Sequence, residues 1–195
     1  MAIHTFGDSH CDNPWACVPN IQRHFVGPKL CFSVGRDGII INNGYNVKNG
    51  DTVIFCFGEI DCRCHIQKHI RSENDYKQII DNIVYNYFVQ IKNAIYTFDN
   101  LKTCIYNVVP PIEKHTNSIQ DAYFPQLGTD EERKTYVLYF NEKLKEKCME
   151  YGFIYFDVYD KYTDSNGFLN KSLSDGSVHI RDGIHMKEFI ETNDL

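Results

Sequence analysis

The stretch AIHTFGDSH, residues 2–10, passes from an apolar, strand-like run into a glycine, an acid and a serine. Gly7 and Asp8 favour a turn, and Ser9 could cap a helix that follows it. A serine on the tight bend between a strand and a helix is also a typical nucleophile, because its hydroxyl stands above the sheet beside backbone N–H groups. The stretch predicts a strand that ends in a turn, and it leaves both roles of Ser9 open.

Length and composition predict one globular domain over residues 1–195. The chain is 43% hydrophobic and 24% charged, which is ordinary for a protein with a substantial core. Its formal net charge of −6 argues against a nucleic acid partner, because phosphate binding needs a basic face. No apolar run approaches the roughly 18 residues of a membrane span, and no signal peptide is visible. We therefore expect no membrane partner and a cytoplasmic location.

Eight cysteines do not indicate a disulfide framework in this chain. Cys56 and Cys104 lie inside apolar runs and are expected to be buried small hydrophobic residues. The stretch CRCH, residues 62–65, is the one candidate metal motif, but zinc ligands usually come as C-x2–4-C pairs and no second pair stands out. We expect reduced thiols, no bound metal and no other cofactor.

Apolar runs alternate with helical patterns along the chain. Strands are predicted at 2–7, 21–27, 51–58, 102–111 and 153–159, and helices at 73–98 and 129–150. The run DTVIFCFG at 51–58 is apolar on both faces, which is typical of a parallel sheet covered on both sides. Thr129 and Glu132 fit a capping box, and 112–128 is expected to be a loop. The order of elements predicts a doubly wound α/β domain.

In such a sheet, functional groups lie at the carboxyl ends of the strands, near the point where strand order reverses. A serine nucleophile needs a base, and a histidine base needs an acceptor for its other ring nitrogen. The late stretch SDGSVHIRDGIHM, residues 174–186, supplies both groups. Asp182 lies three residues before His185 and can fold back to its ring. We therefore expect Ser9, His185 and Asp182 to form a catalytic triad.

Other interpretations of these residues stay open. His179 is a rival base, although the position three residues before it is Gly176 and the nearest acid, Asp175, lies four residues before it. His185 could be an ordinary loop histidine, since exposed histidines need no function.

From these residues the chain resembles the SGNH, or GDSL-like, hydrolase family. The resemblance runs from Gly7-Asp8-Ser9 through Gly27 and Gly58-x-x-Asp61 to Asp182-x-x-His185. It implies a flavodoxin-like, three-layer α/β/α sandwich with a parallel sheet of about five strands. Members are mostly esterases, lipases and carbohydrate O-deacetylases. By this resemblance Ser9 is the nucleophile, His185 the base and Asp182 the residue that orients it.

The resemblance also implies an oxyanion hole, and here the sequence departs from the family. The family uses the N–H of the serine, a glycine N–H after the second strand and an asparagine side chain after the third. Ser9 and Gly27 match the first two donors, with Gly44 as a second possibility for the glycine. Ile60 stands at the asparagine position, and the loss of one oxyanion donor typically costs about 2.7–4 kcal/mol.

Three nearby side chains are candidates for substrate binding or for a substitute donor: Arg63, His10 and Glu59. His65 is a further possible donor. We expect the Arg63 guanidinium to point into the Ser9 cleft, because its planar fork can donate two hydrogen bonds. A structural ion pair between Arg63 and Glu59 is the alternative.

The sequence favours a serine esterase that removes a small acyl group, an O-acetyl group in particular, from a carbohydrate. The run GEIDCRCHI, residues 58–66, resembles a GDSL-like subgroup often found near glycan-modifying enzymes, and association with or fusion to such an enzyme is expected. An acyltransferase with the same triad and a non-catalytic glycan- or protein-binding module are the alternatives. Because the chain ends soon after the helix-like MKEFIE, residues 186–191, the domain could lack its last helix or be cut from a longer protein.

Overall fold

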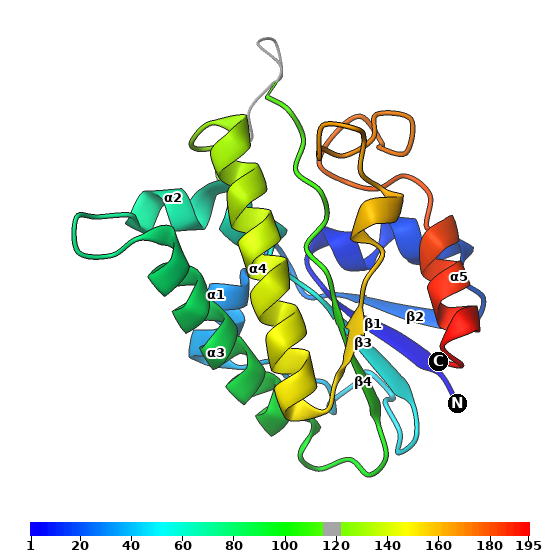
Figure 1. The fold of residues 1–195 in the computed structure, drawn as a ribbon. Helices are drawn as coiled ribbons and strands as arrows, with labels where there is room; N and C mark the ends of the chain where they lie inside the picture. Colours follow the sequence, from blue (N-terminus) through cyan, green and yellow to red (C-terminus); the bar gives the residue numbers. More distant parts are fainter. Residues whose placement is uncertain (115–121) are drawn as a thin grey trace.

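A parallel five-stranded sheet forms the centre of the computed structural model, which describes residues 1–114 and 122–195 (Figure 1). Its strands are β1 (Ile3–Gly7), β2 (Ile21–Phe25), β3 (Thr52–Cys56), β4 (Lys102–Tyr106) and β5 (Ile154–Phe156). They are hydrogen-bonded in the order β2-β1-β3-β4-β5, and each neighbouring pair is parallel. The topology confirms the predicted doubly wound α/β fold, and each predicted apolar run contains one of these strands.

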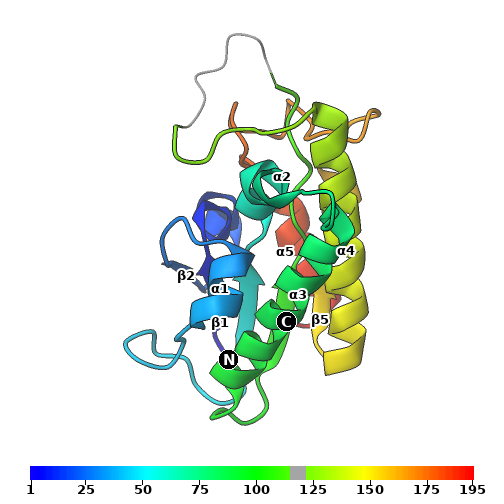
Figure 2. The ribbon, with the colours of Figure 1, turned by 90° about the vertical axis from the view of Figure 1, so that its left-hand side faces the viewer.

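Helical elements cover both faces of the sheet. On one face lie α1 (Cys31–Asp37), α3 (Tyr76–Ile95) and α4 (Asp130–Tyr151), as Figure 2 shows from the side. The other face carries α5 (Ile184–Thr192) and the 3-10 turns η1 (Ser9–Cys11) and η2 (Asn13–Cys17). The remaining elements are a π-helix, η3 (Asp61–His65), the short α2 (Ile66–His69) and a 3-10 turn, η4 (Tyr159–Lys161). This is the expected three-layer α/β/α sandwich.

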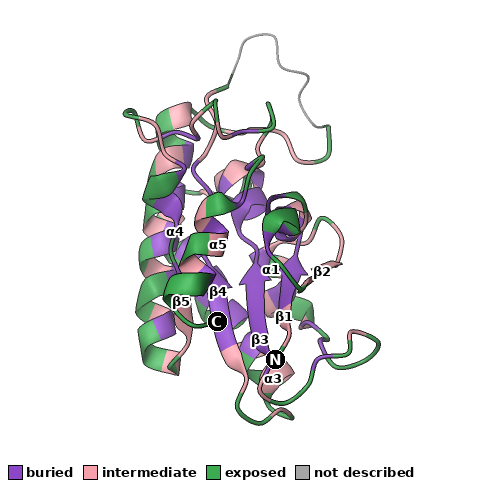
Figure 3. Ribbon diagram, turned by 90° about the vertical axis from the view of Figure 1, so that its right-hand side faces the viewer, coloured by how far each residue is buried: buried purple, intermediate pink, exposed green. Residues whose placement is uncertain are grey.

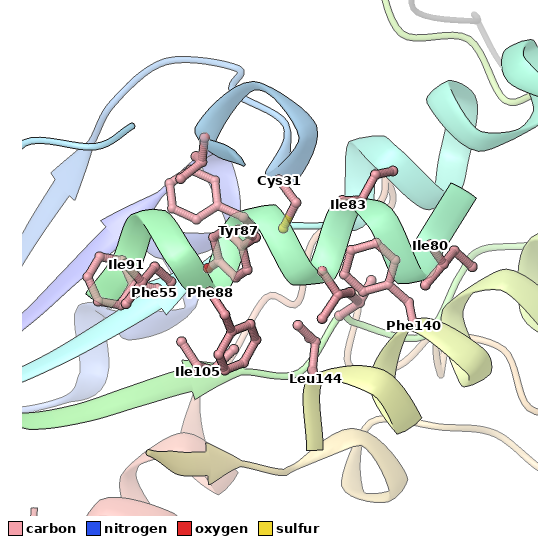
Figure 4. Close-up of a cluster of buried hydrophobic side chains, with 14 of the residues drawn as sticks. Cys31, Phe55, Ile80, Ile83, Tyr87, Phe88, Ile91, Ile105, Phe140 and Leu144 are labelled. Carbon is pink, nitrogen blue, oxygen red and sulfur yellow. The ribbon is translucent and has the colours of Figure 1, made fainter. Parts of the chain in front are cut away.

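The central strand β3 contributes side chains to a core on each face of the sheet. Val53 and Phe55 belong to the core beneath α3 and α4, whereas Ile54 and Cys56 belong to the core beneath η2 and α5. All five residues of β3 are buried (Figure 3). Figure 4 shows the first of these cores, which includes side chains of β3, β4 and the covering helices. The continuous apolar run of β3 thus reflects burial on both sides.

Local signals in the sequence define the two long helices. The Asp75 carboxylate accepts hydrogen bonds from Lys77 N and Gln78 N at the start of α3. Thr129 and Glu132 form the predicted capping box at the start of α4. In the predicted loop 112–128, residues 115–121 lie outside the described part, and 122–128 contain neither helix nor strand. Among the described residues, no helix combines the length and apolar character needed to cross a bilayer.

Gly7 packs directly against β3 at the end of β1. It pairs with Cys56, and a Cβ placed on Gly7 would lie 2.2 Å from the Cys56 carbonyl oxygen and 2.8 Å from Cys11 Cβ. Real side chains do not tolerate such contacts with backbone atoms. Gly7 is therefore required by packing at the end of the strand, just before the chain leaves the sheet.

Replacing Gly7 with alanine should lower the free energy of unfolding by about 3 kcal/mol, because the methyl group forces β1 and β3 apart. Gly50→Ala is the matched control, since Gly50 has a positive φ of 83° but open space around its Cβ position. The control should cost about 1 kcal/mol, from backbone strain alone. Urea denaturation measures both values, and equal losses would contradict the packing argument.

Candidate active site

Ser9 lies at the carboxyl edge of the sheet, where strand order reverses. The chain runs from β1 outward to β2 and later returns to β3 on the other side of β1. The residues after β1 and β3 therefore flank the crevice in which ligands of such folds bind. Ser9 is the first residue of η1, directly after the buried Asp8, and it is partly exposed.

The Ser9 hydroxyl contacts the imidazole of His179. Ser9 Oγ lies 2.8 Å from His179 Nε2, and His179 Nδ1 lies 3.1 Å from Asp175 Oδ2. Burial lowers the pKa of His179, and the charge of His10 lowers it further against the opposing effect of Asp175. A neutral imidazole between a hydroxyl and a carboxylate can accept the serine proton and then be stabilised as imidazolium. A hydroxyl, an imidazole and a carboxylate are thus in contact within one site.

A tight turn brings Asp175 and His179 together. Asp175 N donates to His179 O, and Ser174 and Ile180 form an antiparallel bridge on either side of them. Gly176 adopts a positive φ of 94° within the turn. The spacing of four residues is therefore suited to an acid and a base that face each other across a turn.

The expected partnership of Ser9 with His185 and Asp182 is wrong in its geometry. His185 lies in the first turn of α5, where its Nδ1 is 2.8 Å from Glu188 Oε2 and its ring packs against Tyr162. Asp182 Oδ1 accepts the Ile184 N–H at the start of the same helix. Both residues are thus used by α5 itself: Asp182 accepts a hydrogen bond at the helix start, and His185 contacts Glu188 within the helix.

The sequence did contain a signal for Asp175 and His179, the acid and histidine that lie together beside Ser9. Asp175, Gly176 and Ser177 are residues with strong turn preferences, and His179 follows them closely. Turn chemistry therefore indicates an acid and a histidine that fold toward each other, whereas the spacing D-x-x-H in 182–185 is equally compatible with a helix start. A rule that places the acid three residues before the histidine selects Asp182 and His185, which do not contact Ser9.

Two backbone N–H groups are available for an oxyanion. Among the described residues, neither Ser9 N nor Gly27 N donates a hydrogen bond to a backbone or side-chain acceptor. Gly27 follows β2, and Val26 N donates to Gly7 O, which ties this segment to the end of β1. Gly27 has a positive φ of 91° and open space beside it. Gly44, the second possibility, belongs instead to the connection between α1 and β3.

The residues after β3 stabilise the fold at the position where the family has an oxyanion donor. The side chain of Ile60 is buried and has no polar atom. Next to it, the Asp61 carboxylate accepts hydrogen bonds from Cys31 N and Phe32 N, at the start of α1. Burial raises the pKa of Asp61 to about 7 against the opposing effect of these hydrogen bonds. Asp61 therefore anchors α1, and Ile60 leaves the third donor position without a donor.

The Arg63 guanidinium does not point into the Ser9 cleft, contrary to expectation. Its Nε lies 2.9 Å from Glu59 Oε1, and its Nη1 donates to the Phe124 carbonyl oxygen at 2.9 Å. Leu127 N in turn donates to Arg63 O. Both side chains of the ion pair are about nine-tenths buried. Arg63 and Glu59 thus hold the segment that contains Phe124 and Leu127 against η3.

His10 is not free to serve as a substitute oxyanion donor either. Its Nδ1 lies 2.8 Å from Asp8 Oδ1, and its Nε2 lies 3.3 Å from the Val178 carbonyl oxygen. His65 is also occupied otherwise, because its ring packs between Phe32 and His69.

The cysteines form no metal centre in the described structure. All eight are free, and burial raises the pKa of the Cys62 and Cys64 thiols. A thiol held in its neutral form is a poor metal ligand. Among residues 1–114 and 122–195, no group of three or more histidine, cysteine or acidic side chains is arranged to hold a metal ion.

Two small cavities lie beside the residues that follow β3, and neither is bordered by Ser9 or His179. Both are bordered by Glu59 and hold about 10 Å³ each, and one of them is also bordered by His10. That volume holds roughly one water molecule. A larger cavity of about 450 Å³ lies between α1, α2 and α3 and includes neither Ser9 nor His179.

The fold resembles that of lipolytic enzymes of GDSL type. A GDSL-like lipase from Bacteroides thetaiotaomicron has a TM-score of 0.66 and 11% identity over 98% of this chain and 86% of its own. A member of the lipolytic G-D-S-L family from Veillonella parvula has a TM-score of 0.57 and 17% identity over 98% and 97%. A catalytic mutant of an acetylxylan esterase from Geobacillus stearothermophilus has a TM-score of 0.58 and 9% identity over 100% and 92%.

At these identities the likeness establishes the fold, which is that of the SGNH, or GDSL-like, hydrolases. No protein-family model matches the sequence, and no curated protein matches it either.

The ion pair of Arg63 and Glu59 should contribute to stability through its burial. Arg63→Met leaves the Glu59 carboxylate buried and uncompensated, which should lower the free energy of unfolding by about 3 kcal/mol. The double variant Glu59→Gln, Arg63→Met removes both charges and should recover part of that loss. Chemical denaturation of both single variants and the double variant gives the coupling energy, and strictly additive losses would contradict a direct pair.

Proposed function

We propose that this protein is a serine-dependent ester hydrolase that removes a small acyl group, in particular an O-acetyl group, from a carbohydrate. The observation that carries the proposal is the chain of contacts from Ser9 Oγ through the His179 imidazole to the Asp175 carboxylate. It lies at the carboxyl edge of the sheet, in the fold of the GDSL-type hydrolases.

Acylation begins with attack of Ser9 Oγ on the acyl carbonyl carbon, while His179 Nε2 takes the hydroxyl proton. The charge on the carbonyl oxygen is met by the N–H groups of Ser9 and Gly27. When the tetrahedral intermediate collapses, the ester C–O bond breaks and His179 gives its proton to the departing sugar oxygen. The products of this half-reaction are the free sugar hydroxyl and an acyl ester on Ser9.

Deacylation repeats the sequence with water as the nucleophile. His179 takes a proton from water, and the resulting hydroxide attacks the acyl carbon of the Ser9 ester. Collapse of the second intermediate breaks the bond to Ser9 Oγ, which regains its proton from His179. Asp175 stabilises the imidazolium that forms in each half-reaction. The acyl group leaves as a carboxylic acid.

The comparison with known structures supports a small acyl group on a carbohydrate. One of the similar structures is that of an acetylxylan esterase.

The net charge of −6 does not favour nucleic acid as a partner. The free cysteines suit a reducing compartment, and the cytoplasm stays the predicted location.

A non-catalytic binding module is the second candidate, and Ile60 is the observation that favours it. A buried aliphatic side chain at the third donor position weakens stabilisation of the transition state. This loss would slow an enzyme, but it would not affect a module that only binds its ligand. An acyltransferase would use the same serine chemistry with a sugar hydroxyl in place of water. The following two experiments separate catalysis from binding, and product analysis with a sugar acceptor separates hydrolysis from transfer.

A fluorophosphonate probe should label Ser9, as peptide mapping by mass spectrometry would show. His179→Asn should slow labelling by about 1,000-fold, because the hydroxyl loses its base. His185→Asn is the matched control and should leave the rate unchanged, since His185 contacts Glu188 rather than Ser9. Absence of labelling in folded protein at about pH 8, where His179 is neutral, would favour the binding module.

Ile60→Asn should raise kcat on an activated acetyl ester by about 10-fold or more, because it supplies the missing amide donor. The full contribution of such a donor is about 10²–10³-fold in kcat. Ile60→Leu controls for repacking of this buried position and should leave kcat near the wild-type value. An unchanged kcat in folded Ile60→Asn protein would mean that the oxyanion does not face this position.

A further inference from the structure

We propose that His10 is a permanently charged positioning residue, an imidazolium that ties the turn of the nucleophile to the loop of the base and keeps His179 neutral. The effect on catalysis rests on the proposed function, whereas the protonation state of His10 does not. His10 follows the nucleophile directly in the chain, yet it makes no contact with the Ser9 hydroxyl.

A chain of contacts runs from the nucleophile turn through His10 to the base loop. Asp8 Oδ1 accepts from His10 N at 2.9 Å and lies 2.8 Å from His10 Nδ1. On the other side of the ring, His10 Nε2 lies 3.3 Å from the carbonyl oxygen of Val178. Val178 immediately precedes His179. The residue before Ser9 and the residue before His179 are therefore connected through one buried ring.

The partners of the ring determine its charge. A carboxylate and a carbonyl oxygen are acceptors only, so each contact needs an N–H on the imidazole side. A neutral imidazole has one N–H and would leave one of these contacts without a proton. Only the imidazolium donates to Asp8 and Val178 at once. The geometry alone thus assigns a positive charge to His10.

The electrostatic surroundings agree with this assignment. Burial alone would lower the pKa of His10, but the charge and hydrogen bond of Asp8, the charge of Glu59 and the Val178 carbonyl together raise it to about 9. The ionisable groups that face the ring are Asp8 on its own turn, Glu59 after β3 and His179 on the base loop. The Glu59 carboxylate is already paired with Arg63. The Asp8 carboxylate is therefore the anion that compensates the charge of His10.

The charge of His10 acts on the base at short range. The ring centroids of His10 and His179 are 4.9 Å apart, and the repulsion disfavours a second proton on His179. Asp175 and Glu59 act in the opposite direction. Loss of the His10 charge should therefore raise the pKa of His179, and the base would become protonated, and inactive, at a higher pH.

Histidine NMR tests the charge in the wild-type protein. Long-range 1H–15N spectra should show both ring nitrogens of His10 protonated at about pH 7.5, below its raised pKa, while His179 is neutral. The His10 resonances are assigned by their loss in His10→Gln, and His185→Gln provides the comparison for an exposed histidine. A neutral His10 ring at this pH would overturn the proposal, whether or not the protein hydrolyses esters.

Kinetics of His10→Gln test the positioning role. The acidic limb of the kcat/KM profile should move to higher pH by about one unit, as expected for a charge at this distance in a partly screened site. NMR titration of His179 should show the same shift in its pKa without any reference to activity. His185→Gln should change neither value.

An unshifted acidic limb and an unshifted His179 titration in folded His10→Gln would overturn the role of His10. If that variant does not fold, sequential resonance assignment of the wild-type protein identifies the His10 ring, and its spectra still decide the charge. An inactive protein that nevertheless shows the His179 shift would contradict the proposed function and leave the assignment of His10 supported.

Discussion

The close contact between β1 and β3 at Gly7 determines where the chain leaves the sheet at its carboxyl edge. The Gly7 position has no room for a side chain because the Cys56 carbonyl occupies it, so β1 reaches the edge tight against its neighbour. From there the chain must turn at once, and the turn carries Asp8, Ser9 and His10. The crevice at the reversal of strand order therefore begins with a serine whose backbone is held by the sheet itself.

The side chains around the turn divide into two groups with different tasks. Ser9, His179 and Asp175 are in contact and partly exposed, so a ligand in the crevice could reach them. The pairs of Asp8 with His10 and of Glu59 with Arg63 are buried and hold neighbouring segments together. The stretch after β3, which the family uses for an oxyanion donor, here belongs to the second group, because Asp61 binds the start of α1.

Much of the fold could be predicted from the sequence, because its signals are local. The apolar run of β3, the capping box at Thr129 and the glycine that ends β1 each report on their own neighbourhood. The site was predictable only in part. Ser9 lies at the predicted place after β1, but the histidine that contacts it comes from a distant loop, and spacing alone did not distinguish His179 from His185. The difference lies in local backbone geometry, since one histidine follows a turn and the other begins a helix.

Arg63 illustrates a second limit of sequence reasoning. A donor-rich stretch beside a missing donor suggests a substitute, yet the guanidinium binds Glu59 and the Phe124 carbonyl oxygen. Phe124 is 61 residues away from Arg63 in the chain, and no local pattern relates the two. Side chains with several hydrogen-bonding groups are shared among partners that only the tertiary structure brings together.

The contact between Ser9 and His179 spans 170 residues, nearly the whole chain. On the ribosome, the β1 turn emerges well before the segment that contains His179. In a partly synthesised chain, the Ser9 hydroxyl has no imidazole partner until that segment packs against the β1 turn. The hydrogen bond between Ser9 and His179 thus exists only in a chain in which these two distant segments have docked.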